Sequence, residues 1–121
     1  MYDQIAISLI VMLGLDATYI SQIKTPYLKQ IENIQKSKVN VKTTGVVLCY
    51  LFMVFGINYF IIQKKASLLD AFLFGVVVYG VYDTTAYALF TNWSAILAIL
   101  DVIWGGVLML TTTYITYQFS A

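Results

Sequence analysis

The sequence predicts an all-α fold: a bundle of four membrane-spanning helices, with an amphipathic interfacial helix between the first and second spans. Hydrophobic residues make up 60% of the chain and charged residues only 11%, which is too little polar surface to cover a water-soluble globule. Four apolar stretches are long enough to cross a bilayer, which takes about 20 residues. We therefore expect residues 1–121 to form a single integral membrane domain.

The first span is predicted over residues 5–23, and a more polar stretch follows it. Thr25 and Pro26 are typical of a helix start, and apolar residues then recur at helical spacing up to Ile34. This pattern predicts a short helix lying on the membrane surface. The alternative is a solvated loop.

The other three spans are predicted over residues 43–62, 68–90 and 94–117. The third and fourth spans are joined by a short polar turn at residues 91–94, so they should form a helical hairpin. Trp93 lies in this turn, and we expect it to be an anchor at the membrane interface, where tryptophan is enriched.

Lysine is distributed unevenly between the predicted connections. By the positive-inside rule, the lysine-rich connection over residues 24–42 should face the cytoplasm, with both termini on the opposite side. Clustered lysines next to a membrane favour anionic lipid headgroups, so a lipid bilayer and not a nucleic acid is the expected partner. The lysines of this predicted lipid-facing surface are Lys24, Lys29, Lys36, Lys38 and Lys42.

Several classes of chemistry lack the residues that they need. The chain contains no histidine, the commonest metal ligand and general base. Cys49 is the single cysteine, so neither an intramolecular disulfide nor a cysteine metal cluster can form. The sequence contains no phosphate-binding loop, zinc motif or nucleophile–base pair. We expect no metal, no cofactor and no enzymatic activity.

Three acids are predicted to share one layer of the membrane. Asp16 lies eight residues from Lys24, and Asp83 and Asp101 each lie nine residues from Asn92 in the turn of the hairpin. At 1.5 Å per residue, each carboxyl group is roughly 12–14 Å below the same membrane face. An acid at that depth is costly and marks a candidate functional site.

The acids have aromatic hydrogen-bond donors at matching positions. Tyr50 reaches a similar depth in the second span, and Tyr79 and Tyr87 lie four residues on either side of Asp83. No lysine is placed to reach this layer, so the acids must be neutral, share protons, or contact these donors, water or a cation. The candidate ligand- or proton-binding residues are Asp16, Asp83, Asp101, Tyr50, Tyr79, Tyr87 and Trp104.

Two functions are compatible with an acidic layer. The first is a small protein for proton- or cation-linked transport or ligand binding, in which at least one acid is protonated at neutral pH because burial disfavours carboxylates. Small multidrug transporters, with four short helices and an acid in the first, offer an analogy. The second is a structural subunit of a homo-oligomer or larger assembly, such as a membrane complex or a virion membrane layer. Its acids would join helices through polar bonds, which contribute about 0.6 kcal/mol each.

Four short motifs, three of which contain one of the acids, occur along the chain in a fixed order. The chain has LDATYI at residues 15–20, YLKQI at 27–31, YDTT at 82–85 and DVIWG at 101–105. With these motifs it resembles the DUF2177 family, small predicted membrane proteins of unknown function, over nearly its whole length.

The family pattern has LDxxWL, YDLTN, GWP and VDxxWG in these places. Here Tyr19 stands in place of the first Trp, Ala86 in place of the Asn, and Asn92 and Ser94 in place of the Gly and Pro. All three Asp positions match. The resemblance therefore implies the four-helix fold and the acidic site, and it implies no particular reaction. Ala86 removes one polar group near Asp83.

Overall fold

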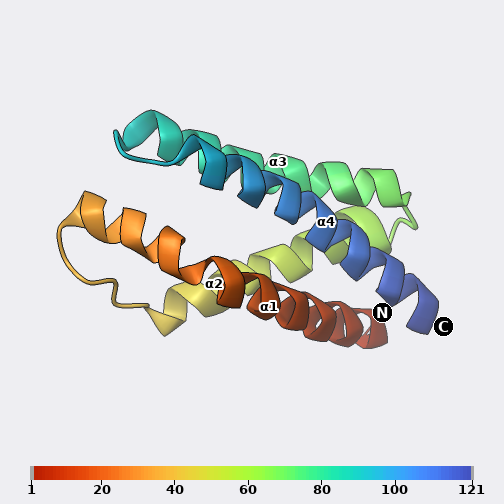
Figure 1. The fold of residues 1–121 in the computed structure, drawn as a ribbon. Coiled ribbons are helices and arrows are strands. Elements are labelled where there is room, and N and C mark those ends of the chain that lie inside the picture. The colour runs from red at the N-terminus through yellow and green to blue at the C-terminus, as the bar shows by residue number, and fades with distance from the viewer. Residues whose placement is uncertain (1, 121) are drawn as a thin grey trace.

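Four long helices, each apolar enough to cross a membrane, make up most of the computed structural model, which describes residues 2–120. They run alternately up and down, and both chain ends lie at the same end of the bundle (Figure 1). This arrangement confirms the predicted four-helix membrane fold. The helices are α1 (Tyr2–Gln35), α2 (Thr43–Ile57), α3 (Leu68–Leu89) and α4 (Ala95–Phe119), and a π-helical turn, η1 (Asn58–Ile62), extends α2.

Local sequence signals set several helix ends. Ser67 and Ser94 precede α3 and α4 as N-caps, and their side chains accept hydrogen bonds from backbone N–H groups inside the first turn, at 3.1 and 3.2 Å. Lys36 after α1 and Lys65 after η1 adopt positive φ values of 59° and 51°, a conformation that ends helices. The connections from η1 to α3 and from α3 to α4 can therefore be short.

The stretch predicted to form a separate interfacial helix is helical, but it continues α1 without a break through Pro26. The expected helix boundary at Thr25 is therefore wrong. A proline inside a helix removes one backbone hydrogen bond. Packing offsets this cost: the Tyr27 hydroxyl lies 3.0 Å from the Tyr82 hydroxyl, and Gln30 is buried at the turn between α3 and α4.

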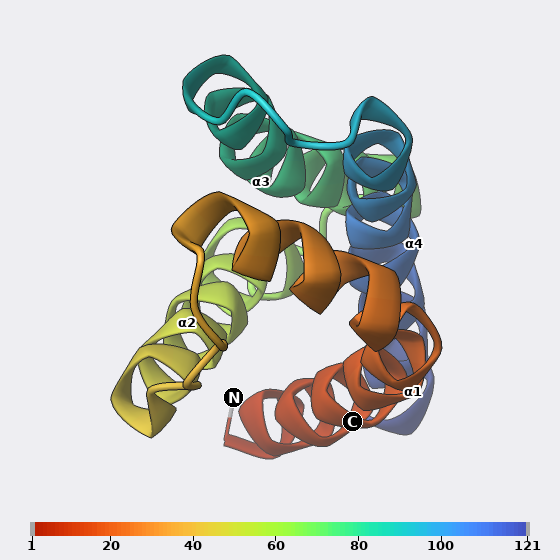
Figure 2. The same ribbon diagram turned by 60° about the vertical axis from the view of Figure 1, so that its left-hand side comes forward.

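α1 changes direction along its length, and its C-terminal part lies between α2 and the turn that joins α3 to α4 (Figure 2). Besides Pro26, two side-chain hydroxyl groups in this part of α1 compete with backbone N–H groups for carbonyl acceptors. Thr18 donates to the Gly14 carbonyl at 3.0 Å, and Ser21 donates to the Thr18 carbonyl at 2.7 Å. Both features are known causes of helix bending. The bend turns the end of the helix across the lysine-rich end of the bundle.

The most extensive helix–helix contact joins α3 and α4, and glycines make it close. A Cβ atom at Gly75 would overlap the carbonyl group of Gly105 and lie 2.9 Å from the Gly106 Cα. Small residues at such crossings let two backbones approach within a membrane. α1 packs against this pair through α4, and η1, which extends α2, also contacts α4.

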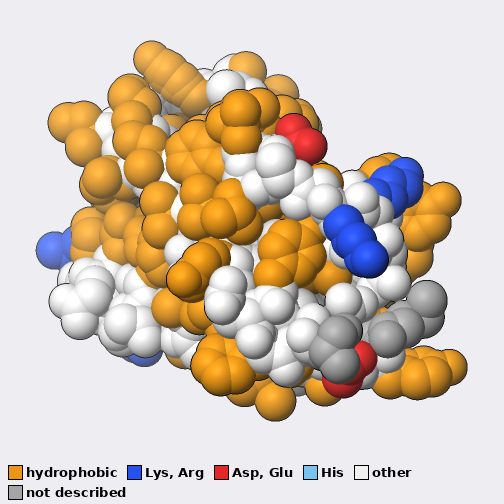
Figure 3. All heavy atoms as spheres, turned by 90° about the vertical axis from the view of Figure 1, so that its right-hand side faces the viewer, with side chains coloured by type: hydrophobic (Ala, Val, Ile, Leu, Met, Phe, Trp, Pro, Cys, Tyr) orange, Lys and Arg blue, Asp and Glu red, His pale blue; other side chains and the backbone are white. Residues whose placement is uncertain are grey.

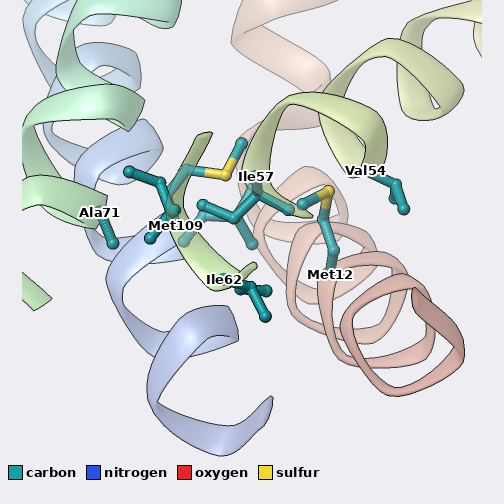
Figure 4. Packing of buried hydrophobic residues seen from close by; sticks show 8 residues of the cluster. Met12, Val54, Ile57, Ile62, Ala71 and Met109 are labelled. Carbon is teal, nitrogen blue, oxygen red and sulfur yellow. The ribbon is translucent and has the colours of Figure 1, made fainter. Parts of the chain in front are cut away.

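The apolar core lies toward the end of the bundle that holds the two termini. Met12 of α1, Ile57 of α2 and Met109 of α4 are fully buried and meet there (Figure 4). Asn58, at the start of η1, donates to Ser8 across the helices at 2.9 Å, and Tyr117 donates to the Ala66 carbonyl at 2.8 Å. This half of the bundle is closely packed and cross-linked by hydrogen bonds.

The outer surface is mostly apolar, as a lipid bilayer requires. Figure 3 shows the end that carries the termini, with hydrophobic side chains over much of the visible face and lysine side chains in its right-hand part and at its left margin. Large side chains such as Ile10, Phe52, Val81 and Ile99 are 60% or more exposed. Such exposure suits contact with acyl chains.

Replacement of Gly75 by alanine should destabilise the bundle by about 1–3 kcal/mol, because the added methyl group has no space against the α4 backbone. Gly80→Ala on the same helix is the matched control, since a Cβ there meets nothing within 4 Å. Unfolding by denaturing detergent in mixed micelles measures both variants. Equal stability of the two would contradict the close contact.

Candidate functional site

The structure brings the three predicted acids into one region of the bundle interior. Asp16 of α1 is 7% exposed and Asp83 of α3 is 1% exposed, while Asp101 of α4 is half-buried. Each acid therefore enters from a different helix, and none points at lipid. They are connected by a set of aromatic side chains.

Both oxygens of Asp16 accept hydrogen bonds from other helices. The Tyr50 hydroxyl of α2 donates to Oδ2, and the Trp104 indole N–H of α4 donates to Oδ1 at 2.9 Å. Asp16 thereby ties three helices together.

Tyr19 contacts both Trp104, which donates to Asp16, and the second acid, Asp101. Its ring stacks on Trp104 with centroids 4.7 Å apart and planes at 2°, and its hydroxyl donates to Asp101 Oδ1 at 3.4 Å. Tyr19 lies one helical turn beyond Asp16 on α1. The stacked pair thus holds the donor groups for two acids in register.

Asp83 of α3 lies beside Asp101 of α4. Its carboxyl group faces the Asp101 carboxyl and the Trp93 indole, but neither oxygen has a hydrogen-bond partner of normal geometry. The buried Trp93 N–H and the buried Gln30 side-chain NH₂ also lack a hydrogen bond of normal geometry. A second polar cluster, composed of Asp83, Trp93 and Gln30, therefore adjoins the acids at the lysine-rich end.

The other predicted site residues have different positions. Tyr79 is in the interior, and its hydroxyl lies 3.8 Å from the Met53 sulfur. Tyr87 is 53% exposed and, within residues 2–120, has no hydrogen bond or ring contact, so it lies apart from the acids. A spacing of four residues puts Tyr87 only approximately on the Asp83 face, because 3.6 residues make a turn.

Trp93 is not the interfacial anchor that its position in the turn predicted. It is 7% exposed, and its ring packs edge-on against Tyr27 at 5.7 Å and Tyr82 at 6.3 Å. The turn folds back over the bundle, so the indole points inward. Tyr19 and Gln30 were also missed as site residues, although Tyr19 occupies the place of a tryptophan in the family pattern.

A cavity of about 870 Å³ lies beside the acids, in the lysine-rich half of the bundle. Asp16 and Asp101 line its inner part, and Lys24 and Lys42 line its outer part. Five tyrosines contribute to its walls together with apolar side chains of α1, α2 and α3. These tyrosines are Tyr19, Tyr27, Tyr50, Tyr79 and Tyr82.

The cavity exists because α2 diverges from its neighbours at this end. α2 and α3 have at most sparse direct contact with each other. Phe52 of α2 and Val78 of α3 both line the cavity while 74% and 37% exposed, so the cavity opens sideways between these two helices. In a bilayer this opening faces the acyl chains.

The fold and the cavity define a multi-pass membrane protein with a polar site between its helices. Comparison with protein families gives a match to a predicted membrane protein family, DUF2177, over residues 2–118. The chain belongs to this family. No curated protein and no solved structure matches it.

Tyr50→Phe should lower the free energy of unfolding by about 0.5–1.5 kcal/mol, because it removes the donor to Asp16 and keeps the ring. Tyr87→Phe removes the same hydroxyl from an exposed position and should have no effect. Unfolding in mixed micelles again measures both. A Tyr50→Phe variant as stable as Tyr87→Phe would show that the bond to Asp16 contributes nothing.

Proposed function

We propose that the chain binds an apolar organic cation in the cavity between α1, α2 and α3, where Asp16 and Asp101 line the wall, and that protons compete with this ligand for Asp101. The observation that carries the proposal is the position of both acids in the wall of a cavity that opens toward lipid. Proton-linked transport of the ligand would extend the same chemistry.

The dimensions of the cavity support binding of a small molecule. Its volume of about 870 Å³ falls within the range of ligand pockets, roughly 300–1,000 Å³. Such pockets combine apolar walls with a few convergent polar groups. Here side chains such as Ile23, Val46 and Met53 form apolar walls, and the two acids are the charged groups at the inner end.

The chemistry of the inner end favours a cation. A carboxylate attracts positive charge strongly where water is excluded. Tyrosine rings attract cations through their faces, and this attraction increases when the cation is desolvated. The cavity provides both kinds of group, with Tyr19 and Tyr50 bonded directly to the two acids.

The side opening suits a ligand that dissolves in the bilayer. A molecule with an apolar surface can enter between α2 and α3 without passing Lys24 and Lys42. Small hydrated cations would instead approach from water, where the exposed lysines repel them. The proposed ligand class is therefore an apolar cation and not an inorganic ion.

Tetraphenylphosphonium, an apolar monovalent cation, is a suitable probe, with calorimetry of purified protein in detergent micelles as the measurement. We expect saturable binding that weakens as the pH falls, because protonated carboxyl groups no longer attract the cation. Asp16→Asn and Asp101→Asn should each weaken binding by about tenfold or more, since each removes one charge at the inner end of the cavity.

Asp70→Asn is the matched control, because Asp70 is an exposed acid at the start of α3 outside the cavity. It should leave binding unchanged. Thermal stability in the same detergent separates loss of binding from loss of fold. Absence of binding by the wild type at any pH, or full binding by the two cavity variants, would overturn the proposal. A structural subunit of a larger assembly would then be the better-supported function.

A further inference from the structure

The polar cluster of Asp83, Trp93 and Gln30 lies outside the cavity, and four of its buried polar atoms lack a hydrogen bond of normal geometry. They are both Asp83 carboxyl oxygens, the Trp93 indole nitrogen, which the Asp83 carboxyl faces, and the Gln30 amide nitrogen. All three side chains are more than nine-tenths buried, with exposed fractions of 1%, 7% and 8%. Native proteins rarely leave such groups unsatisfied, and internal water is the usual partner.

We infer that this cluster binds internal water and forms a proton pathway from the lysine-rich face to Asp83. The unpartnered atoms are complementary, because the two carboxyl oxygens accept and the two nitrogens donate. A water molecule can bridge the acceptor oxygens and the donor nitrogens, since a buried water typically makes about three hydrogen bonds. No cation is required to satisfy a site with this composition.

The position of the cluster connects it to the outside. Gln30 accepts a hydrogen bond from the Ser94 backbone N–H at 2.8 Å, so its side chain lies against the α3–α4 turn. Thr91 and Asn92 of that turn are exposed, and Trp93 follows them directly. From the turn, the Trp93 ring reaches in to Tyr82, beside Asp83. Trp93 thus extends from the exposed turn to Asp83, and Gln30 contacts the same turn beside it.

The inner end of the cluster connects it to the cavity. Asp83 faces Asp101, and Asp101 is bonded to Tyr19 and lines the cavity. A proton carried by water forms an O–H bond at Asp83, and its transfer to the Asp101 carboxylate regenerates the Asp83 carboxylate. The charged and titratable groups that act on Asp83 are Asp101 of α4 and Tyr19 and Tyr27 of α1.

The purpose of the pathway rests on the proposed function, because it supplies the protons that compete with the ligand at Asp101. The hydration of the cluster does not depend on that function. The ligand would approach from the bilayer while protons arrive from the lysine-rich face, so the two would reach the acids by separate routes.

Infrared spectroscopy of the protein in lipid films tests the pathway through hydrogen–deuterium exchange at Asp83. The spectra are recorded at a pH low enough for Asp83 to carry its proton, and its carboxyl band is assigned by its absence in Asp83→Asn. On transfer to D₂O we expect the band to shift promptly. Gln30→Leu should slow this shift by about tenfold or more, because it replaces a water-binding amide with an apolar side chain.

Gln118→Leu is the matched control, since Gln118 is exposed near the end of α4, and it should exchange at the wild-type rate. A wild-type Asp83 that resists exchange would show that the cluster is dry. Exchange in Gln30→Leu at the wild-type rate would show that protons reach Asp83 another way, such as through the cavity. Either result overturns the pathway, and neither bears on whether tetraphenylphosphonium binds in the cavity.

Discussion

Carboxyl groups at mid-depth in a membrane protein need hydrogen-bond donors from the protein itself, because the surrounding hydrocarbon provides none. Much of the architecture in the lysine-rich half follows from this constraint. Tyr50 and Trp104 approach Asp16 from two other helices, and Tyr19 reaches Asp101 while it stacks on Trp104. The acids therefore determine where α1, α2 and α4 converge.

The two halves of the bundle meet different physical requirements. Near the termini, fully buried residues such as Met12, Ile57 and Leu108 pack against one another, and the α3–α4 glycines bring backbones together. Dispersion contacts and short interhelical distances stabilise that half, as is general for membrane bundles. In the lysine-rich half, bulky tyrosines hold the helices apart around a cavity. A closely packed half thus adjoins a half that contains a cavity.

The C-terminal part of α1 connects the two polar regions of the site. Lys24 and Tyr27 line the cavity, and Gln30, less than one further turn along, belongs to the polar cluster at the α3–α4 turn. Because one helix contributes to both regions, a movement of this segment would alter access to the cavity and to Asp83 together. The bend around Thr18, Ser21 and Pro26 is what directs the segment across the bundle.

The sequence by itself determined the four spans, because apolar length is a local property. The common depth of the three acids, counted from Lys24 and Asn92 at a rise of about 1.5 Å per residue, stays a prediction. Tyr50 was also found in this way, because a residue's depth in a straight helix follows from its position. The same local reasoning gave the orientation of the chain, which stays a prediction.

Only the tertiary structure decided which side chains meet. Tyr87 and Tyr79 have the same spacing from Asp83, yet one faces outward and the other lines the cavity. Trp93 was predicted at the interface and is buried, because the direction in which a turn folds back depends on contacts with α1 that are distant in sequence. The continuation of α1 through Pro26 has the same origin, since packing of Tyr27 and Gln30 outweighs a local preference.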